Sequence, residues 1–242
     1  MPRGQMEDAE YTHMDAAEDG MWWYRALHQR LLDALRDVHG RVLDAGCGTG
    51  GFLARLHASR PDLNLAGLEW SPIAAPRAQR KSGVSVARGS ANMLPFADGS
   101  FDAAILADVL CHGAVDPDLA LAEMRRVLRP GGRLIVNMPA YAWLMSAHDV
   151  RVHNARRQNA GQTAAMLRQA GFSARHIRYW NSLPLPMMIV QRKLRSAAHT
   201  ASDVAPFPPW LDTLFHGMTQ FERRLPFAIP AGGSVLAIAE RP

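Results

Sequence analysis

The sequence predicts an α/β fold: a doubly wound, mostly parallel sheet of seven strands with a helical insertion between the last two. Three observations support this. Short apolar runs alternate with amphipathic stretches along residues 41–139, which is typical of βαβ units. A glycine-rich turn over residues 44–51 follows the first apolar run. With 242 residues, 48% hydrophobic and 20% charged, the chain is long enough for one substantial globular domain.

The elements follow in order from these patterns. Residues 1–20 are polar and acidic, which predicts a loose arm and no signal peptide. Residues 21–38 repeat apolar side chains at helical spacing and predict a helix that ends before Gly40. Five strands are then expected, at residues 41–46, 63–70, 84–90, 101–110 and 133–139. Three helices are expected between them, at residues 51–58, 71–83 and 116–129, with Pro76 shortening or bending the second.

The pattern loosens after Pro139. A helix is expected over 161–172, a sixth strand over 173–181 and a seventh over 233–241. The proline-containing segment between the last two strands carries two helical stretches, at 187–198 and 210–224. The sequence thus divides into an N-terminal arm and helix (1–40), a core (41–182), a helical cap (183–232) and a final strand completing the core (233–242).

Charge and cysteine usage exclude several function classes. The net charge of +5 is almost all arginine, since Lys81 and Lys193 are the only lysines, and no basic run is interleaved with aromatics. We therefore expect no nucleic-acid partner. Cys47 and Cys111 lie far apart, which argues against a disulfide framework and a thiolate metal site. No stretch approaches the ~20 apolar residues of a membrane span, so the expected compartment is the cytoplasm.

The glycine-rich turn spells two overlapping nucleotide-binding patterns. Its Gly46, Gly48 and Gly51 form the GxGxxG that cradles a dinucleotide pyrophosphate, whereas the turn read from Asp44 gives D-x-G-x-G-x-G. Glu69 ends the second strand, where a carboxylate can bind two ribose hydroxyls. Because dinucleotides and S-adenosylmethionine both carry such a ribose, these residues alone leave the cofactor open.

Further motifs favour one cofactor. They are “VLDAGCGTG” (42–50), “GLEWSP” (67–72), “GSANMLPFADGSFD” (89–102), “ADVLCH” (107–112) and “DPDLALAEMRRVLRPGG” (116–132). In this order and spacing, about residues 41–139 resemble the class I S-adenosylmethionine-dependent methyltransferases, whose sheet is Rossmann-like. Trp22-Trp23-Tyr24-Arg25, and His148-Asp149 followed by Arg156-Arg157, are similar to motifs of a bacterial small-molecule subgroup.

The resemblance implies S-adenosyl-L-methionine as cofactor and S-adenosyl-L-homocysteine as product. It implies that the glycine turn holds the methionine part, Glu69 the ribose, Trp70 one side of the adenine, and Asp108 a position under the sulfonium. The implied cofactor residues are Asp44, Ala45, Gly46, Cys47, Gly48, Gly50, Glu69, Trp70, Ser90, Ala91, Asn92, Met93, Ala107 and Asp108. The family's usual acid before Ala91 is Ser90 here, so Ser90 or Asn92 would hold the adenine amino group.

Methyl transfer needs the acceptor atom about 3 Å from the methyl group, and it needs a base only when the acceptor loses a proton. The candidate catalytic residues are His112, His148 and His153. The histidine cluster also admits a solvated loop or a metal site, although its spacing fits no standard ligand pair, and we expect no metal. The family's usual glutamate before His112 is Cys111.

The acceptor itself has to be inferred from the cap. Residues 183–225 combine apolar, methionine-rich stretches with basic ends, which favours a small, apolar metabolite or lipid-like acceptor. The same pattern fits peripheral membrane contact, a homodimer seam or the packing face of a lid, and the sequence leaves these open. Two rival readings stay open as well: a methyltransferase-like protein that binds the cofactor without turnover, and an NAD-dependent oxidoreductase, which lacks a Tyr-x-x-x-Lys here.

Overall fold

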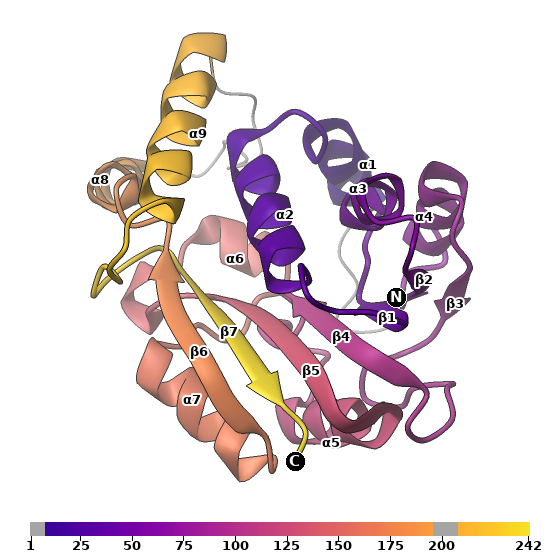
Figure 1. The fold of residues 1–242 in the computed structure, drawn as a ribbon. Helices are drawn as coiled ribbons and strands as arrows, with labels where there is room; N and C mark the ends of the chain where they lie inside the picture. The colour runs from indigo at the N-terminus through magenta and orange to yellow at the C-terminus, as the bar shows by residue number, and fades with distance from the viewer. Residues whose placement is uncertain (1–7, 196–207) are drawn as a thin grey trace.

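One sheet of seven strands organises the part of the chain that the computed structural model describes, residues 8–195 and 208–242 (Figure 1). The strands are β1 (Arg41–Ala45), β2 (Asn64–Glu69), β3 (Val86–Arg88), β4 (Phe101–Ala107), β5 (Leu128–Pro139), β6 (Ser173–Trp180) and β7 (Ser234–Glu240). Their spatial order is β3-β2-β1-β4-β5-β7-β6.

The sheet is parallel from β1 to β5, and β7 runs antiparallel to both β5 and β6. The chain winds outward from β1 in both directions, first through β2 and β3, then through β4 and β5. Asp44 near the end of β1 lies opposite Gly67 of β2 and Ile105 of β4. The loops after these strands therefore meet at a topological switch point, where α/β sheets bind ligands. The predicted fold class is confirmed.

Helices cover both faces of the sheet. They are α1 (Asp8–Ala17), α2 (Trp22–Ala34), α3 (Gly51–Ser59), α4 (Ala74–Ser82), α5 (Pro117–Val127), η1 (Ala142–Leu144), α6 (Ala147–Arg151), α7 (Ala160–Gln169), α8 (Leu185–Arg195) and α9 (Pro209–Arg223). α2, α3 and α4 lie on one face, and α5 and α7 on the other (Figure 1). Ile135 of β5 packs with Leu31 and Leu56 on the first face, and Leu134 packs with Met124 on the second.

The N-terminal segment differs from the prediction, because α1 forms where a loose arm was expected over residues 1–20. Lys81 of α4 binds three acids at the end of this segment, with N–O distances of 2.6 Å to Asp15, 2.7 Å to Glu18 and 3.2 Å to Asp19. The helix is thus attached by long-range ion pairs. Ion pairs with a residue far along the chain produce no repeating apolar pattern within residues 1–20. The sequence therefore contains no sign of α1, and the prediction of a loose arm was wrong.

Several element boundaries also differ from the predicted ones. α2 ends at Ala34, earlier than predicted. Pro76 lies in the first turn of α4, where its missing N–H has no intrahelical partner, so the helix accommodates it. β5 begins earlier than predicted, at Leu128, because this residue pairs with Phe101 before a break in register. None of these shifts moves a predicted element to another place in the sheet order.

The insertion between β6 and β7 consists of α8 and α9 in the described residues, and α9 lies beside α2 (Figure 1). The Phe215 ring lies 5.2 Å from that of Trp22, measured between centroids. The carboxylate of Asp212 accepts a hydrogen bond from the Trp22 backbone N–H at 2.7 Å and pairs with Arg25. The insertion is therefore anchored on the N-terminal helix that flanks the switch point.

Within residues 8–195 and 208–242, no helix combines the length and the hydropathy needed to cross a bilayer.

Candidate functional site

A cavity of about 410 Å³ lies at the switch point, where β1, β2, β4 and β5 end. Its walls come from these strand ends, from α1 and α2 on the N-terminal side, and from α8 of the insertion. Residues in the wall include Tyr11, Glu18, Trp22, Trp23, Leu27, Asp44, Gly48, Glu69, Trp70, Asp108, His112, Asn154, Arg157 and Met188. The site thus combines the core with both flanking segments.

Most of the predicted cofactor residues line this cavity. They are Asp44, Gly46, Cys47, Gly48, Glu69, Trp70, Ser90, Ala91, Ala107 and Asp108. The others do not line it. Ala45 is buried in the core, and Met93 is 78% exposed on the surface. The Asn92 side chain instead bridges a loop, because its Nδ2 donates to the Ala114 carbonyl and its Oδ1 accepts from the Asp116 N–H.

The glycine turn owes its composition to backbone geometry and close packing. Gly46, Gly48 and Gly50 have φ angles of 93°, 56° and 92°, in the region that disfavours residues with a Cβ. A Cβ on Gly46 would lie 2.4 Å from Val109 Cγ2, and one on Gly50 would lie 2.6 Å from Ala78 Cα. Gly50 therefore serves the contact between α3 and α4, while Gly48 faces the cavity.

Three carboxylates gather around this turn. Asp44, Glu69 and Glu18 are 3%, 6% and 4% exposed. Burial, followed by the neighbouring Glu69 and Glu18, raises the pKa of Asp44 to about 7. Burial also raises the pKa of Glu69 and that of Glu18, the latter against the opposing effect of Lys81. Within the described parts of the chain Asp44 forms no ion pair, so this end of the cavity favours a cationic ligand.

Glu69 links the glycine turn to the loop after β2. Its Oε2 accepts the Gly48 N–H at 2.9 Å, and its Oε1 accepts the Ser71 N–H at 2.8 Å. Both bonds fix the carboxylate at the cavity wall. Each carboxylate oxygen can accept more than one hydrogen bond, so capacity is left for hydroxyl groups of a ligand.

Asp108 supplies a fourth carboxylate, from the end of β4. Its φ angle of 54° is unusual for a residue other than glycine, although Asp tolerates it better than most. Asn137 of β5 holds it twice, through a backbone bond of 3.0 Å and through Asn137 Nδ2, which donates to Asp108 Oδ1 at 2.9 Å. Burial raises the pKa of Asp108 to about 7, against the lowering effects of Asn137 and Arg157.

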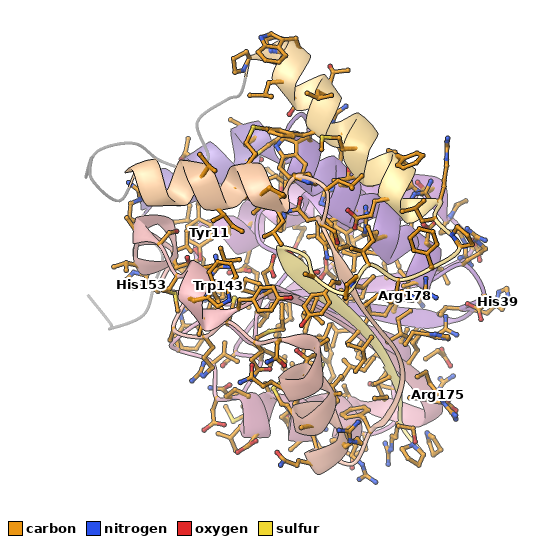
Figure 2. The ribbon with its side chains drawn as sticks, turned by 90° about the vertical axis from the view of Figure 1, so that its left-hand side faces the viewer. Tyr11, His39, Trp143, His153, Arg175 and Arg178 are labelled. Carbon is orange, nitrogen blue, oxygen red and sulfur yellow. The ribbon has the colours of Figure 1, made fainter. Side chains whose placement is uncertain are left out.

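The candidate histidines differ in their position relative to the cavity. His112 lines the cavity, and its Nδ1 lies 3.0 Å from the Val152 carbonyl oxygen. Since that oxygen can only accept, Nδ1 carries the hydrogen and Nε2 keeps a free lone pair. Burial lowers the pKa of His112, so the ring is neutral at pH 7. His153 is exposed at the edge of the molecule (Figure 2), and the side chain of His148 in α6 lies outside the described residues.

The wall also contains a buried ion pair that the sequence does not predict. Arg157 Nη2 lies 2.8 Å from Asp149 Oδ1 and 2.9 Å from Oδ2, and Arg157 Nη1 donates to the Ala140 carbonyl. Asn154 Nδ2 adds a bond to the same carboxylate at 3.2 Å. The Arg156-Arg157 motif was the signal for this pair. Tyr11 and Met188, also in the wall, had no sequence signal that relates them to it.

The distribution of charge decides between the two cofactor classes. A pyrophosphate on the glycine turn would bring two negative charges next to Asp44, Glu69 and Glu18. A sulfonium cofactor instead brings a positive sulfur and an ammonium group, which these carboxylates attract. Residues 43–136 match a family model described as a methyltransferase domain. The match bears out the predicted resemblance of this segment to class I S-adenosylmethionine-dependent methyltransferases, and with it the S-adenosylmethionine cofactor that the resemblance implies.

Relatives of the methyltransferase domain are known from other organisms. The demethylmenaquinone methyltransferase of Deinococcus radiodurans is 37% identical over 119 residues, which cover 47% of this chain and 48% of the relative. The chain thus spans about half the length of the curated relatives it matches. Geranyl diphosphate C-methyltransferase from Streptomyces coelicolor A3(2) superposes with a TM-score of 0.65 at 17% identity, covering 90% of this chain and 79% of that one. The cyclase SpnF gives a TM-score of 0.64 at 22% identity, with 99% of both chains covered.

Proposed function

We propose that this protein transfers the methyl group of S-adenosylmethionine to a small acceptor with an apolar body. The observation that carries the proposal is the composition of the cavity: a cluster of buried carboxylates at the glycine turn is continuous with a largely apolar wall. The first part suits a cationic cofactor, and the second suits an uncharged acceptor. The similarity to the demethylmenaquinone methyltransferase of Deinococcus radiodurans is consistent with an acceptor of this class.

In this proposal each carboxylate binds a different part of the cofactor. Asp44 and Glu18 attract its ammonium group, Glu69 accepts the ribose hydroxyls, and Trp70 flanks the adenine. The role proposed for Glu69 is supported by its two hydrogen bonds from backbone N–H groups, which fix the carboxylate at the cavity wall. Asp108 faces the sulfonium. Glu18 is an addition to the residues inferred from the sequence, and it comes from the segment that follows α1.

Methyl transfer then requires an aligned acceptor. When bound, S-adenosylmethionine supplies a methyl group on a positively charged sulfur, and the electron pair of the broken carbon–sulfur bond stays on that sulfur. For a hydroxyl or acidic-carbon acceptor, Nε2 of His112 accepts the proton, since its lone pair is free and the ring is neutral at pH 7. The described residues offer no cluster of three or more His, Cys, Asp or Glu side chains that could hold a metal ion.

We expect an uncharged acceptor because much of the cavity wall is apolar. Val115, Val152 and Met188 supply part of this apolar surface. Arg157 is the cationic residue in this wall, and its guanidinium group already forms a bidentate ion pair with Asp149. An anionic acceptor would have to compete with that ion pair, whereas an apolar ring or chain needs only the valine and methionine surface.

We further propose that the insertion contacts a lipid surface through α9. Trp210, Leu214 and Phe221 are 68%, 49% and 61% exposed. At 100° per residue they lie within about 40° of each other around the helix, on the side opposite the buried Phe215. The sequence of α8 adds positive charge at 192–195, which complements anionic lipid. Such contact would bring an apolar acceptor close to the cavity.

The test uses S-adenosylmethionine with a radiolabelled methyl group and a lysate of the source organism. Products are extracted into organic, aqueous and protein fractions. Glu69→Ala, which should weaken cofactor binding, is the loss-of-function control, and Glu240→Gln, which removes a partly exposed carboxylate outside the cavity wall, is the matched control. Label in the organic phase, lost only in Glu69→Ala, supports the proposal. Label in the aqueous or protein fraction contradicts the apolar acceptor.

The same experiment, combined with a binding measurement, distinguishes this proposal from the alternative of a protein that binds the cofactor without catalysis. If calorimetry detects S-adenosylmethionine binding but no fraction takes up label, the chain binds the cofactor without transferring its methyl group. Binding of NAD in preference to S-adenosylmethionine would contradict the role given to the carboxylates, because the dinucleotide brings its pyrophosphate to the same turn.

A further inference from the structure

We propose that Trp180, acting through Asn137, holds the carboxylate of Asp108 toward the sulfonium and so sets the preference for S-adenosylmethionine over S-adenosylhomocysteine. This inference rests on the proposed function, and it assigns a positioning role to residues that do not themselves contact the ligand. The two cofactor forms differ in charge at the sulfur, and Asp108 is the carboxylate nearest the end of β4 that can respond to that difference.

Two hydrogen bonds fix the orientation of the buried Asn137 amide. Trp180 Nε1 lies 2.8 Å from Asn137 Oδ1, and both residues are buried, at 3% and 0% exposure. An indole N–H can only donate. The Asn137 oxygen must therefore face Trp180, which leaves the amide NH₂ group to face Asp108. That group donates to Asp108 Oδ1 at 2.9 Å.

A donor at this position favours the ionised form of Asp108, because a carboxylate accepts the bond and a protonated acid gains less from it. The other charged groups that act on Asp108 are Arg157, which favours ionisation, and Asp149, which opposes it. These two form a bidentate pair with each other, so their effects on Asp108 largely offset. Burial is the largest effect and raises the pKa of Asp108, and the Asn137 amide donor is the main group that opposes it.

Trp180 is itself held in place by buried groups. The Arg30 guanidinium lies 4.7 Å from the centroid of the Trp180 ring, and the Trp23 ring stacks on Trp180 at 5.9 Å. Arg30 lies 3.6 Å from Glu222 of α9, whose Oε2 accepts the Ser182 N–H at 2.7 Å. A continuous set of contacts thus joins the insertion to Asp108 through β6 and β5.

Removal of the indole donor frees the amide to turn. In Trp180→Phe the Asn137 oxygen has no donor to face, and it can rotate toward Asp108, where it accepts a hydrogen bond from the protonated acid. The neutral acid no longer attracts a positive sulfur. Binding of S-adenosylhomocysteine, whose sulfur is neutral, is unaffected by this change.

The experiment measures the affinity of the full chain for S-adenosylmethionine and S-adenosylhomocysteine by calorimetry at pH 7.5 and 8.5. Trp180→Phe removes the N–H donor and keeps an aromatic ring beside Arg30 and Trp23. Asn137→Leu, of similar size, is the second variant, for use if the first fails to fold. Tyr179→Phe is the matched control. It lies at the neighbouring position of β6 and loses one partly buried hydrogen bond, which the Tyr179 hydroxyl accepts from the Ala160 N–H.

We expect Trp180→Phe to weaken S-adenosylmethionine about three- to tenfold at pH 7.5, the scale of one charge-assisted interaction. S-adenosylhomocysteine should change by less than about twofold, and the higher pH should restore part of the loss, because it ionises Asp108 again. Equal losses for both ligands, or no change for either, would overturn the inference and leave the proposed function standing. Failure of the unaltered chain to bind either ligand would overturn both.

Discussion

Arg157 and Asp149 form a bidentate ion pair inside the cavity wall, with guanidinium–carboxylate distances of 2.8 and 2.9 Å and side-chain exposures of 4% and 0%. Asp149 also accepts from the Ser146 N–H at 2.8 Å, so the short helix α6 is tied to the loop that follows β5. A pair this deeply buried costs much of its attraction in lost hydration, and its main consequence is that neither partner can be removed alone.

Asp149→Asn should therefore destabilise the protein strongly, because it leaves the Arg157 charge buried without a counter-charge. We expect the free energy of unfolding to fall by about 3–5 kcal/mol, as measured by urea denaturation. Glu240→Gln breaks the pair with Arg175, whose side chains are 59% and 39% exposed, and should cost less than about 1 kcal/mol. Equal losses in the two variants would contradict this account of the cavity wall.

Asp44 should make cofactor binding depend on pH near neutrality. Its pKa is raised to about 7 by burial and by nearby carboxylates, so the free protein carries a proton there at lower pH. A cationic ligand binds the ionised form, which means that affinity rises with pH through about 7 and then levels off. Calorimetry at pH 6, 7 and 8 should show proton release on binding, and Asp44→Asn should bind weakly with a flatter pH profile.

The same substitution should stabilise the cofactor-free protein. Because the pKa of Asp44 in the folded state lies above its ordinary value, folding takes up a proton between the two values. Stability contributed by this group is therefore lost as pH rises through about 7. Asp44→Asn should raise the melting temperature at pH 8 and have little effect near pH 4. A lower melting temperature at pH 8 would show that Asp44 has a favourable partner in the free protein.

Glu69→Ala should reduce S-adenosylmethionine affinity by roughly 1.5–3 kcal/mol, the scale of hydrogen bonds lost to a charged group. Part of this loss is indirect, because Glu69 also holds Gly48 and Ser71 in place. Ser71→Ala, which leaves the Ser71 backbone N–H and its bond to Glu69 intact, is the matched control. Unchanged affinity in Glu69→Ala, with an unchanged circular dichroism spectrum, would remove Glu69 from the site.

The sequence predicts the sheet and the glycine turn well, because both depend on local patterns. These patterns are alternating apolar residues, glycines where φ is positive, and a carboxylate at the end of a strand. Predictions from the sequence fail where contacts between distant parts of the chain determine the structure. α1 is held by Lys81, a residue far along the chain. Asn92 fits the adenine loop in sequence, yet its amide is committed to residues 114–116. Asp149 and Arg157 become a pair only once β5 and α6 are in place.

The exposed stripe on α9 should bind anionic lipid. Replacement of Trp210, Leu214 and Phe221 by Ser removes apolar surface that faces away from α2, so folding and cofactor affinity should hardly change. Co-sedimentation with vesicles of anionic phospholipid should fall at least fivefold, and the unaltered chain should lose binding as salt rises. If the unaltered chain instead sediments as a dimer that the three substitutions dissociate, the stripe is a seam between two copies.

His112→Gln should test the proposed base. Gln can keep a donor toward the Val152 carbonyl but cannot accept a proton at neutral pH, so the loop geometry is retained while the chemistry is lost. For an acceptor that must lose a proton, we expect kcat to fall about a hundredfold with the KM for S-adenosylmethionine little changed. Because burial lowers the pKa of His112 below the ordinary histidine value, the activity of the unaltered protein should hold through neutral pH and decline only on the acid side. His153→Gln, at an exposed position outside the cavity wall, is the matched control. An unchanged kcat in His112→Gln would mean that the acceptor attacks without a base, as an amine with a free lone pair does.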